Sequence, residues 1–310
     1  MPELPDVTVY VERLATLLVG HTLQRVRLKS PFLLRTVEPP LSAAEGRTIA
    51  GVRRVGKRIV LELRGPGEPL FLVLHLMIAG RLRWAEAGAA IPGKIGVAAF
   101  DSDAGTLLLT EAGSKKRASL HLLAGEAALA AHDRGGLEPL TASTADFAAA
   151  LRRENHTLKR ALTDPRLLSG IGNAYSDEIL HRARLSPFVQ TGALTDAQIA
   201  ALHDATRAVL GEWTTRLRDE AAADARAGHA LPRKVTAFRP GMAVHGRYGQ
   251  PCPVCGAPVQ RILYAENEAN YCARCQTEGR LLADRVLSRL MKDDWPRTLE
   301  ELEERAGPKG

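Results

Sequence analysis

Four cysteines near the carboxyl end of the chain have the spacing of a metal site. Cys252 and Cys255 form one C-x-x-C pair, Cys272 and Cys275 form a second, and sixteen residues separate the two pairs. Each such turn can present two sulfurs, so two pairs at this spacing can surround one tetrahedral Zn²⁺. Four protein ligands leave no open coordination position, which predicts a structural metal. A redox dithiol or buried free thiols are the alternatives, and neither needs a second matched pair.

A second chemical feature lies at the amino end, where the chain begins Met-Pro-Glu-Leu-Pro-Asp. Removal of Met1, which a small second residue favours, would make Pro2 a terminal secondary amine with a pKa of about 8. Such an amine can attack a sugar C1′ to give an iminium ion, an electron sink that promotes β-elimination of the 3′ phosphate. Glu3 is placed to protonate the ring oxygen as a general acid. The alternative is a proline-rich start that carries no chemistry.

Two internal segments offer contacts to phosphate. Lys57 lies in a basic run at the entry to a strand, where its ammonium can donate a proton or anchor a phosphate. A solvated, charged strand edge is the alternative there. Residues 170–173 read Gly-Ile-Gly-Asn ahead of a helix, so backbone N–H groups can approach a phosphate closely, and Lys159 can add a cation. An ordinary packing corner between two helices is the alternative for this turn.

Composition excludes several classes of protein. Of 310 residues, 45% are hydrophobic and 25% are charged, which is neither disordered nor collagen-like. No apolar run approaches the ~20 residues of a membrane span, and the acidic amino end lacks a signal-peptide pattern. We therefore expect a cytoplasmic protein with no membrane partner and with reduced cysteines. The net charge of +7 fits nucleic acid, an anionic membrane or an acidic partner, and does not choose among them.

The expected helices and strands that position these residues indicate an α+β protein with several domains. Residues 1–125 should hold one helix near Val7–Val19 and several short strands rich in Val, Ile and Leu, as in a sandwich or barrel. Residues 126–230 are expected to be helical, with the clearest helix start at Thr195-Asp196. The remaining segments are a linker at 231–251, a zinc-finger hairpin at 252–282 and a weakly packed, charged extension at 283–310.

Taken in order, these motifs resemble the bacterial formamidopyrimidine-DNA glycosylase and endonuclease VIII family. The resemblance covers about residues 1–282, and Leu4 is more similar to the formamidopyrimidine branch. It implies an N-terminal catalytic β-sandwich domain, a helix–two-turn–helix DNA-binding domain and a C-terminal zinc finger, with DNA in the cleft. The motifs that carry it are the Met-Pro-Glu-Leu-Pro start, Lys57, His75-Leu76 with Gly80, the run from Gly170 to Glu178, and the paired cysteines.

The resemblance also assigns roles to residues. Pro2 matches the family's Schiff-base nucleophile, Glu3 its catalytic acid and Lys57 its catalytic lysine. It implies a monomer that holds one structural Zn²⁺, binds double-stranded DNA containing damaged bases or abasic sites, and works in the cytoplasm at the nucleoid. The residues expected to contact DNA are His75, Ile78, Lys116, Arg117, Lys159, Asn173, Tyr175 and Asn267.

Departures from the family pattern bear on the substrate. Met77-Ile78 replaces the usual Gly-Met after His75-Leu76, and residues 113–118 lack the aromatic of the family's Arg-Phe loop, so Lys116 or Arg117 would have to fill the vacated stack. Asn267 stands where the zinc hairpin usually carries an Arg, which weakens phosphate anchoring and puts δ-elimination in doubt. Asp6 replaces the usual Glu. We expect intact chemistry with altered lesion recognition.

The predicted function is therefore a bifunctional DNA glycosylase and AP lyase of base excision repair. It would excise a damaged base, by family default an oxidised purine, through a Schiff base at Pro2 and cleave the strand by β-elimination. A glycosylase for a different or bulkier lesion and a non-catalytic damaged-DNA-binding paralogue are the alternatives. Retention of Pro2, Glu3 and Lys57 together argues against the binder, which would need none of them.

Overall fold

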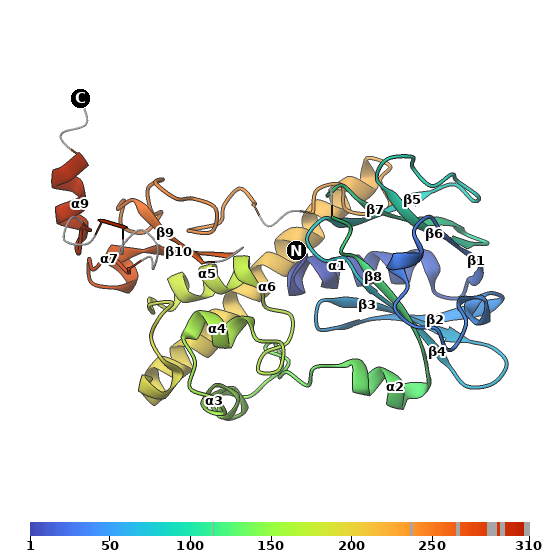
Figure 1. Ribbon diagram of the computed structural model, residues 1–310, viewed down its shortest axis with the longest axis horizontal. Coiled ribbons are helices and arrows are strands. Elements are labelled where there is room, and N and C mark those ends of the chain that lie inside the picture. Colours follow the sequence, from blue (N-terminus) through green and yellow to red (C-terminus); the bar gives the residue numbers. More distant parts are fainter. Residues whose placement is uncertain (114, 236–237, 265–266, 284–289, 292–294, 307–310) are drawn as a thin grey trace. The chain divides into compact units, whose positions relative to one another are not determined.

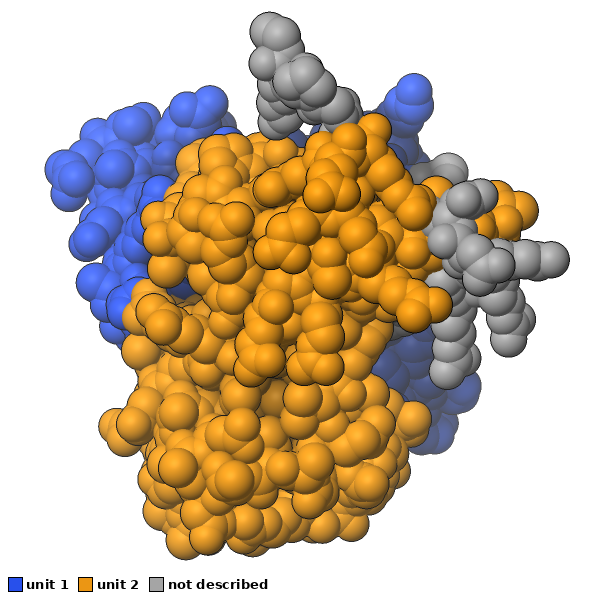
Figure 2. Space-filling view, turned by 90° about the vertical axis from the view of Figure 1, so that its left-hand side faces the viewer, with its two compact units in different colours: residues 1–136, 211–237 blue, residues 137–210, 238–310 orange. Residues whose placement is uncertain are grey.

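The computed structural model describes residues 1–310 apart from 114, 236–237, 265–266, 284–289, 292–294 and 307–310. The chain divides into two compact units, coloured separately in Figure 2. Unit 1 comprises residues 1–136 and 211–237, and unit 2 comprises residues 137–210 and 238–310. Among the described helices, none is long and apolar enough to cross a membrane.

Unit 1 is built on antiparallel strands in the order β5-β7-β6-β1-β2-β3-β4-β8. β1 pairs with β2 only through Thr22 and Leu23, although it pairs with β6 over most of its length. This short seam lets the sheet fold into the two layers of the β-sandwich (Figure 1). The strands are β1 (Thr22–Leu28), β2 (Arg47–Val55), β3 (Arg58–Arg64), β4 (Leu70–His75), β5 (Gly80–Ala85), β6 (Gly96–Ser102), β7 (Gly105–Glu111) and β8 (Ser119–Ala124).

Helix α1 (Leu4–Leu18) packs into the core that both layers share. Its side chains at Val7, Tyr10, Leu14 and Leu18 recur at helical spacing and are at most 2% exposed. Each buried side chain of this size contributes about 1.5–3 kcal/mol through removal of apolar surface from water. The helix predicted near Val7–Val19 is confirmed, and it begins three residues earlier than predicted.

Two features of unit 1 differ from the sequence pattern. The apolar run from Pro69 to Trp84 is not one strand, because β4 pairs with β3 and β8 whereas β5 pairs with β7. The pattern also misses β8, which follows a charged loop rather than a glycine or proline turn. Leu120 and Leu122 of β8 are completely buried, so this strand completes the layer formed by β2, β3 and β4.

Unit 2 begins with a helical region. Gln198 N–H donates to Thr195 Oγ1 at 3.2 Å and Thr195 N–H donates to Gln198 Oε1 at 3.0 Å, which confirms the predicted helix start. Helix α6 (Asp196–Arg226) is shared by the two units, because its residues from Gly211 onward belong to unit 1. Helix α2 (Gly125–His132) also belongs to unit 1. The other helices here are α3 (Thr144–Arg152), α4 (Leu158–Thr163), α5 (Asn173–Arg182) and the first part of α6 (Asp196–Arg226).

The zinc-finger hairpin consists of β9 (Val259–Tyr264) and β10 (Asn267–Cys272), followed by α7 (Ala273–Gln276). It shares unit 2 with the helical region, so the compact units do not follow the five segments expected from the sequence. Helix α9 (Leu299–Ala306) closes the described chain, and its Leu299 is 2% exposed. The prediction that the extension packs weakly is therefore wrong for this part of it.

Candidate active site

Pro2 and Glu3 are both buried at the start of α1. The Glu3 backbone N–H donates to Asp6 Oδ2 at 3.0 Å, and the Glu3 side chain accepts from the Asp6 N–H in return. This reciprocal capping box satisfies two N–H groups that a helix start would otherwise leave open, and it fixes the direction in which the chain leaves Pro2. Asp6, a departure from the family pattern, is therefore part of the support for the amino end.

The terminal amine lies in a cationic and partly desolvated setting. The described amine is that of Met1, which stands one residue ahead of the Pro2 amine that processing would expose. Burial lowers the pKa of this amine, the nearby Glu3 carboxylate raises it, and the positive charges of Arg81 and Lys57 lower it. The net lowering increases the fraction of free base near neutral pH, which is the nucleophilic form of an amine.

Lys57 lies in the two-residue turn between β2 and β3 rather than inside a strand. Gly56, the first residue of the turn, has a left-handed φ of +60°, which suits the tight turns that join antiparallel strands. The ammonium of Lys57 influences both the terminal amine and the His75 ring. The fold therefore gathers the predicted catalytic residues Pro2, Glu3 and Lys57 at one end of the sandwich.

His75 ends β4 with its ring orientation fixed. Nδ1 accepts the Met77 N–H at 3.1 Å, so the neutral ring carries its proton on Nε2. Burial, followed by the charges of Arg58 and Lys57, lowers the pKa of His75 to about 4. At neutral pH the ring is therefore an uncharged donor through Nε2, which suits a hydrogen bond to a phosphate oxygen.

Ile78 occupies the turn between β4 and β5, and it is 54% exposed although it is apolar. The turn is tightly constrained, because Met77 has a left-handed φ of 50° and a Cβ at Gly80 would lie 2.2 Å from the Leu76 carbonyl oxygen. A rigid turn that presents one exposed aliphatic side chain is similar to the apolar wedges with which DNA-bending proteins enter base steps.

Lys116 and Arg117 lie exposed on the loop between β7 and β8. The root of this loop is the buried Glu111, whose carboxylate accepts the Arg117 N–H at 2.9 Å and the Ala118 N–H at 3.2 Å. Lys116 Nζ also donates to the Glu111 carbonyl oxygen. A carboxylate that is 1% exposed thus fixes the backbone beneath two cationic side chains.

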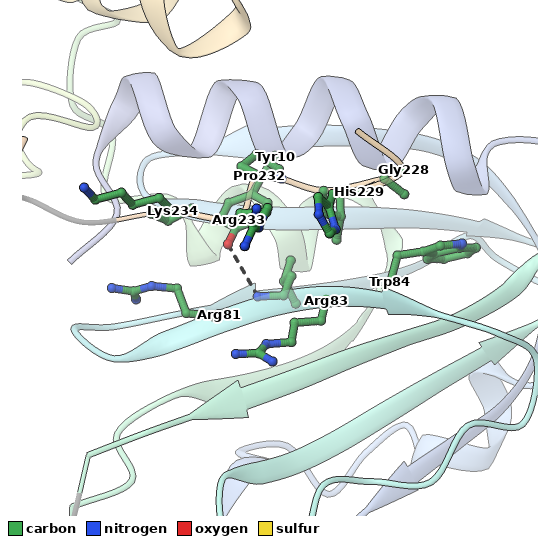
Figure 3. A pocket seen from close by; sticks show the side chains of 13 residues that line it. Tyr10, Arg81, Arg83, Trp84, Gly228, His229, Pro232, Arg233 and Lys234 are labelled. Atoms are coloured by element: carbon green, nitrogen blue, oxygen red, sulfur yellow. Dashed lines mark hydrogen bonds between the residues drawn. The ribbon is translucent and has the colours of Figure 1, made fainter. Parts of the chain in front are cut away.

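A pocket of about 590 Å³ opens in unit 1 between α1, β5 and residues 228–235 (Figure 3). Tyr10 reaches across its floor from α1, with its hydroxyl 3.5 Å from the Leu82 nitrogen. The polar lining of the pocket comes mainly from Arg81, Arg83, His229, Arg233 and Lys234, with Trp84 as an aromatic wall. None of the residues that line the pocket is acidic, so the pocket favours an anionic or electron-rich group.

In unit 2, Lys159 is buried and not available on the surface. Its Nζ donates to Asp177 Oδ1 at 2.5 Å and to the Asn173 carbonyl oxygen at 2.7 Å. Asp177 Oδ2 in turn contacts His245 Nδ1 at 2.8 Å and accepts from Asn270 Nδ2 at 3.3 Å. The phosphate contact predicted for Lys159 is therefore not the role this geometry supports. Lys159 instead positions the start of α5.

The predicted glycine turn leads directly into α5. Gly170 has a left-handed φ of +80°, and Asn173 is the first residue of the helix, half-buried, with Gly172 as its N-cap. The amino end of a helix carries a partial positive charge, which suits an anion. Tyr175 is only 1% exposed, so it supports the turn from within rather than extending from it.

The four cysteines converge as predicted. Their sulfurs lie within 4.8 Å of one another, with Cys255 and Cys272 3.3 Å apart and Cys252 and Cys275 3.9 Å apart. Four ligands at the Zn–S distance would be separated by about 3.8 Å, so the set fits one structural Zn²⁺. Burial raises the pKa of Cys275 to about 11 and raises that of Cys272, so these two sulfurs would need a bound cation to be ionised at neutral pH.

The zinc ligands are supported from the helical region. His181 Nε2 lies 3.3 Å from Cys252 Sγ, and the Val254 N–H donates to the same sulfur at 3.5 Å. Contacts of this kind orient a ligand and tune its charge. Asn267 begins β10 opposite Tyr264, and its side chain, with the contact predicted for it, lies outside the described part of the structure.

A β-sandwich with a buried proline beside the amino terminus, a helical module in which a glycine turn leads into α5, and a four-cysteine zinc hairpin together define a DNA glycosylase of the helix–two-turn–helix class. Three family models match in this order. The formamidopyrimidine-DNA glycosylase N-terminal domain matches residues 1–121, the H2TH domain of the same enzyme matches 136–217, and the zinc finger found in FPG and IleRS matches 249–277. The chain belongs to the formamidopyrimidine-DNA glycosylase family.

Individual relatives agree with this assignment. Formamidopyrimidine-DNA glycosylase of Thermus thermophilus is 35% identical over 290 residues, which cover 90% of this chain and all of the relative. An uncharacterised formamidopyrimidine-DNA glycosylase-like protein of Mycobacterium tuberculosis is 42% identical over 157 residues, 51% of this chain and 94% of that protein.

Two solved structures extend the comparison. The crystal structure of the Thermus thermophilus Fpg protein superposes with a TM-score of 0.72 at 33% identity and covers 89% of this chain and 98% of that one. The complex of Lactococcus lactis Fpg with DNA containing an abasic site superposes with a TM-score of 0.75 at 25% identity, covering 89% and 99% of the two chains.

Several supporting residues escape sequence reasoning. Arg81 and Glu111 sit in ordinary strand patterns, and nothing in their spacing indicates that one faces the terminal amine and the other holds a loop. The buried pair Asp177 and Glu178 lies inside the recognised Gly170–Glu178 run, but its partners are distant in sequence. Glu178 accepts backbone N–H groups of residues 243–245, so only the folded unit reveals its role.

Proposed function

We propose that this chain is a bifunctional DNA glycosylase and AP lyase of base excision repair, with the Pro2 amine as its nucleophile. The observation that carries the proposal is the buried amino end, where Glu3, Lys57 and Arg81 surround the terminal amine. Glu3 is 3% exposed and the two cations are half-buried, and a charged cluster withdrawn from water in this way has little value for stability alone.

The chemistry follows from this arrangement. The free amine of Pro2 attacks C1′ of the damaged nucleotide, the bond from C1′ to the base breaks, and the base leaves with the electron pair. Glu3 accepts the proton that the Pro2 nitrogen gives up after the attack and passes it to the sugar ring oxygen as the C1′–oxygen bond breaks, which leaves an iminium ion between the nitrogen and C1′. Loss of a C2′ proton and cleavage of the C3′–O bond release the 3′ phosphate by β-elimination. Lys57 holds phosphate or relays a proton beside the amine.

Substrate recognition is assigned to the surrounding turns and to the pocket. His75 and Asn173 provide uncharged and backbone-supported contacts to phosphate, Lys116 and Arg117 add cations, and Ile78 enters the stack that a flipped nucleotide vacates. The acid-free pocket beside Arg81 receives a nucleobase rich in carbonyl oxygens, which favours the oxidised purines of the family default. The volume of the pocket also accommodates a bulkier lesion. Excision assays on duplexes that each carry a different damaged base distinguish an oxidised purine from a bulkier substrate.

Borohydride trapping on a duplex with one abasic site tests the nucleophile. The chain from which Met1 has been removed should form a covalent adduct, because borohydride reduces the iminium ion. The Pro2→Gly variant should form much less of this adduct. Pro66→Gly, which changes an exposed proline of the same unit, is the matched control and should trap normally. Failure of the native chain to trap would favour the non-catalytic damaged-DNA binder.

The site of action follows from the substrate. We place the protein in the cytoplasm at the nucleoid, as a monomer on double-stranded DNA. Because neutralised phosphates release counterions, its affinity for a damaged duplex should fall steeply between about 50 and 200 mM salt. A flat salt response would count against a phosphate interface.

A further inference from the structure

The chain returns over its own zinc hairpin after the region that the family shares. The zinc-finger family match ends at residue 277. Beyond it, Leu281 N–H donates to the Arg297 carbonyl oxygen at 2.8 Å, and Leu299 N–H donates to the Gly279 carbonyl oxygen at 2.8 Å. Arg280 and Thr298 form an antiparallel bridge between these bonds. Residues 297–299 thus add a short strand alongside residues 279–281.

This strand leads into a helix with a well-formed start. Arg297 N–H donates to Glu301 Oε2 at 2.8 Å, and Glu301 N–H donates to Thr298 Oγ1 at 3.3 Å. Such reciprocal contacts satisfy the open N–H groups at the first turn of α9 and fix the direction in which the helix runs. The helix is therefore a defined element whose faces can be assigned.

One face of α9 lies against the metal ligands. Leu299 is 2% exposed and belongs to the same apolar cluster as Cys252 and Cys272, and Leu302 packs against that cluster together with Cys255 and Cys275. Glu300, which lies between the two leucines, and Glu303 and Glu304, which follow them, are exposed. Two leucines three residues apart therefore pack into the apolar cluster that contains the cysteines, while the acidic side chains of Glu303 and Glu304 face water.

We propose that residues 295–306 form a strap that closes the zinc centre and slows exchange of its metal. Zinc leaves a four-thiolate site when a competing ligand or water reaches the sulfurs, and apolar side chains around the site control that access. With Leu299 and Leu302 in place, a chelator must wait for the strap to open locally. The strap is separate from the proposed glycosylase chemistry, because it acts on the metal and not on DNA.

The test measures the rate at which the zinc-loaded full-length chain transfers its metal to the chromogenic chelator 4-(2-pyridylazo)resorcinol. Leu302→Ala should release zinc about tenfold faster, the change that 1.4 kcal/mol makes in an opening equilibrium. Glu303→Ala is the matched control on the exposed face of the same helix, with the same new residue, and should release zinc at the native rate. A chain that ends at Met291 should release it faster still.

Circular dichroism and the thermal transition of the zinc-loaded proteins accompany the rates. If the shortened chain is misfolded, the comparison of Leu302→Ala with Glu303→Ala decides the question alone. Equal release rates for these two variants would overturn the proposal, and so would a folded shortened chain that releases zinc at the native rate. Trapping on abasic DNA is measured separately, so failure of the glycosylase mechanism would leave the zinc result readable.

Discussion

Lys159 Nζ lies 2.5 Å from Asp177 Oδ1, and the two side chains are only 4% and 0% exposed. Such a pair is costly to bury, and it persists here because both partners make further bonds, Lys159 to the Asn173 carbonyl oxygen and Asp177 to His245. The pair thereby ties α4, the start of α5 and the segment that leads to the zinc hairpin into one polar network. Lys159 therefore contributes to the site by holding Asn173 in position at the start of α5.

Replacing Lys159 should destabilise unit 2 rather than simply remove a phosphate contact. Lys159→Met leaves the Asp177 carboxylate buried without its cation, which typically costs about 3–5 kcal/mol. Arg160→Met removes the same charge from the next, exposed residue and should barely change the thermal transition. Thermal unfolding with parallel DNA-binding titrations separates the two variants. Equal melting temperatures, with weakened binding only in the Lys159 variant, would instead support a direct DNA contact.

The environment of the terminal amine predicts a pH effect. Burial is the main cause of the lowered pKa of the Met1 amine, and the charge of Arg81 lowers it further. We expect the same charge to act on the Pro2 amine, so Arg81→Gln should raise its pKa and move the acid limb of the trapping rate to higher pH. Trapping should be slower than native at pH 6 and converge with it at pH 9. Single-turnover rates at saturating protein isolate this effect from DNA affinity.

Arg83→Gln is the natural control for the Arg81 variant. It makes the same change of charge two residues along β5, at a position that does not influence the terminal amine strongly. Its pH profile should overlay that of the native protein. If both variants shift the profile equally, general loss of positive charge rather than proximity to the amine is responsible.

The sequence predicts the residues proposed for the chemistry more fully than it predicts the residues that hold them in place. The four cysteines can be predicted from local spacing, because two C-x-x-C pairs define a tetrahedral ligand set, whereas the roles expected of Pro2 and Glu3 rest on the resemblance to the family. Lys159 illustrates the limit, because a lysine near a glycine turn suggests a phosphate contact until its buried partner Asp177 is known. Strand β8 shows the same limit, since its role depends on pairing with β4, whose His75 pairs with Ser119 forty-four positions further along the chain.

Glu111 predicts a link between a buried carboxylate and DNA recognition. Its oxygens accept the N–H groups of Arg117 and Ala118, and Glu111→Gln would turn an amide NH₂ toward one of these donors. Hydrogen bonds to a charged group contribute about 1.5–3 kcal/mol, so the loop should lose its fixed conformation. Affinity for a duplex with a tetrahydrofuran abasic analogue, measured by fluorescence anisotropy, should fall about tenfold.

The matched control for Glu111→Gln is Asp103→Asn. Asp103 also accepts a backbone N–H, that of Thr22 at 3.1 Å, but it lies at an exposed position. The control makes the same exchange of carboxylate for amide in the same unit. Should the two variants bind the abasic analogue equally well, the Glu111 carboxylate would not organise the loop for DNA.

A group of histidines beneath β4 and β8 predicts acid sensitivity of unit 1. Burial lowers the pKa of His121 to about 4, as it does for His75, and the charges of His132, Arg58 and Arg35 contribute to the His121 shift. Between about pH 4 and 6.5 the unfolded chain binds protons that the folded chain does not. Stability is therefore fully present above pH 6.5 and is lost as the pH falls toward 4, by at most about 1.4 kcal/mol per pH unit for each ring.

His121→Phe tests this linkage, because it keeps a ring against His132, whose centroid lies 4.5 Å away, and removes one titrating group. Free energies of unfolding from urea titrations at pH 7 and pH 5 should show a smaller loss in the variant, by at most about 2 kcal/mol. Carboxylates that titrate in the same range affect both proteins alike and cancel in the difference. Parallel pH profiles for the two proteins would mean that His121 binds protons equally in the folded and unfolded chains, which would contradict a half-buried, neutral ring at this position.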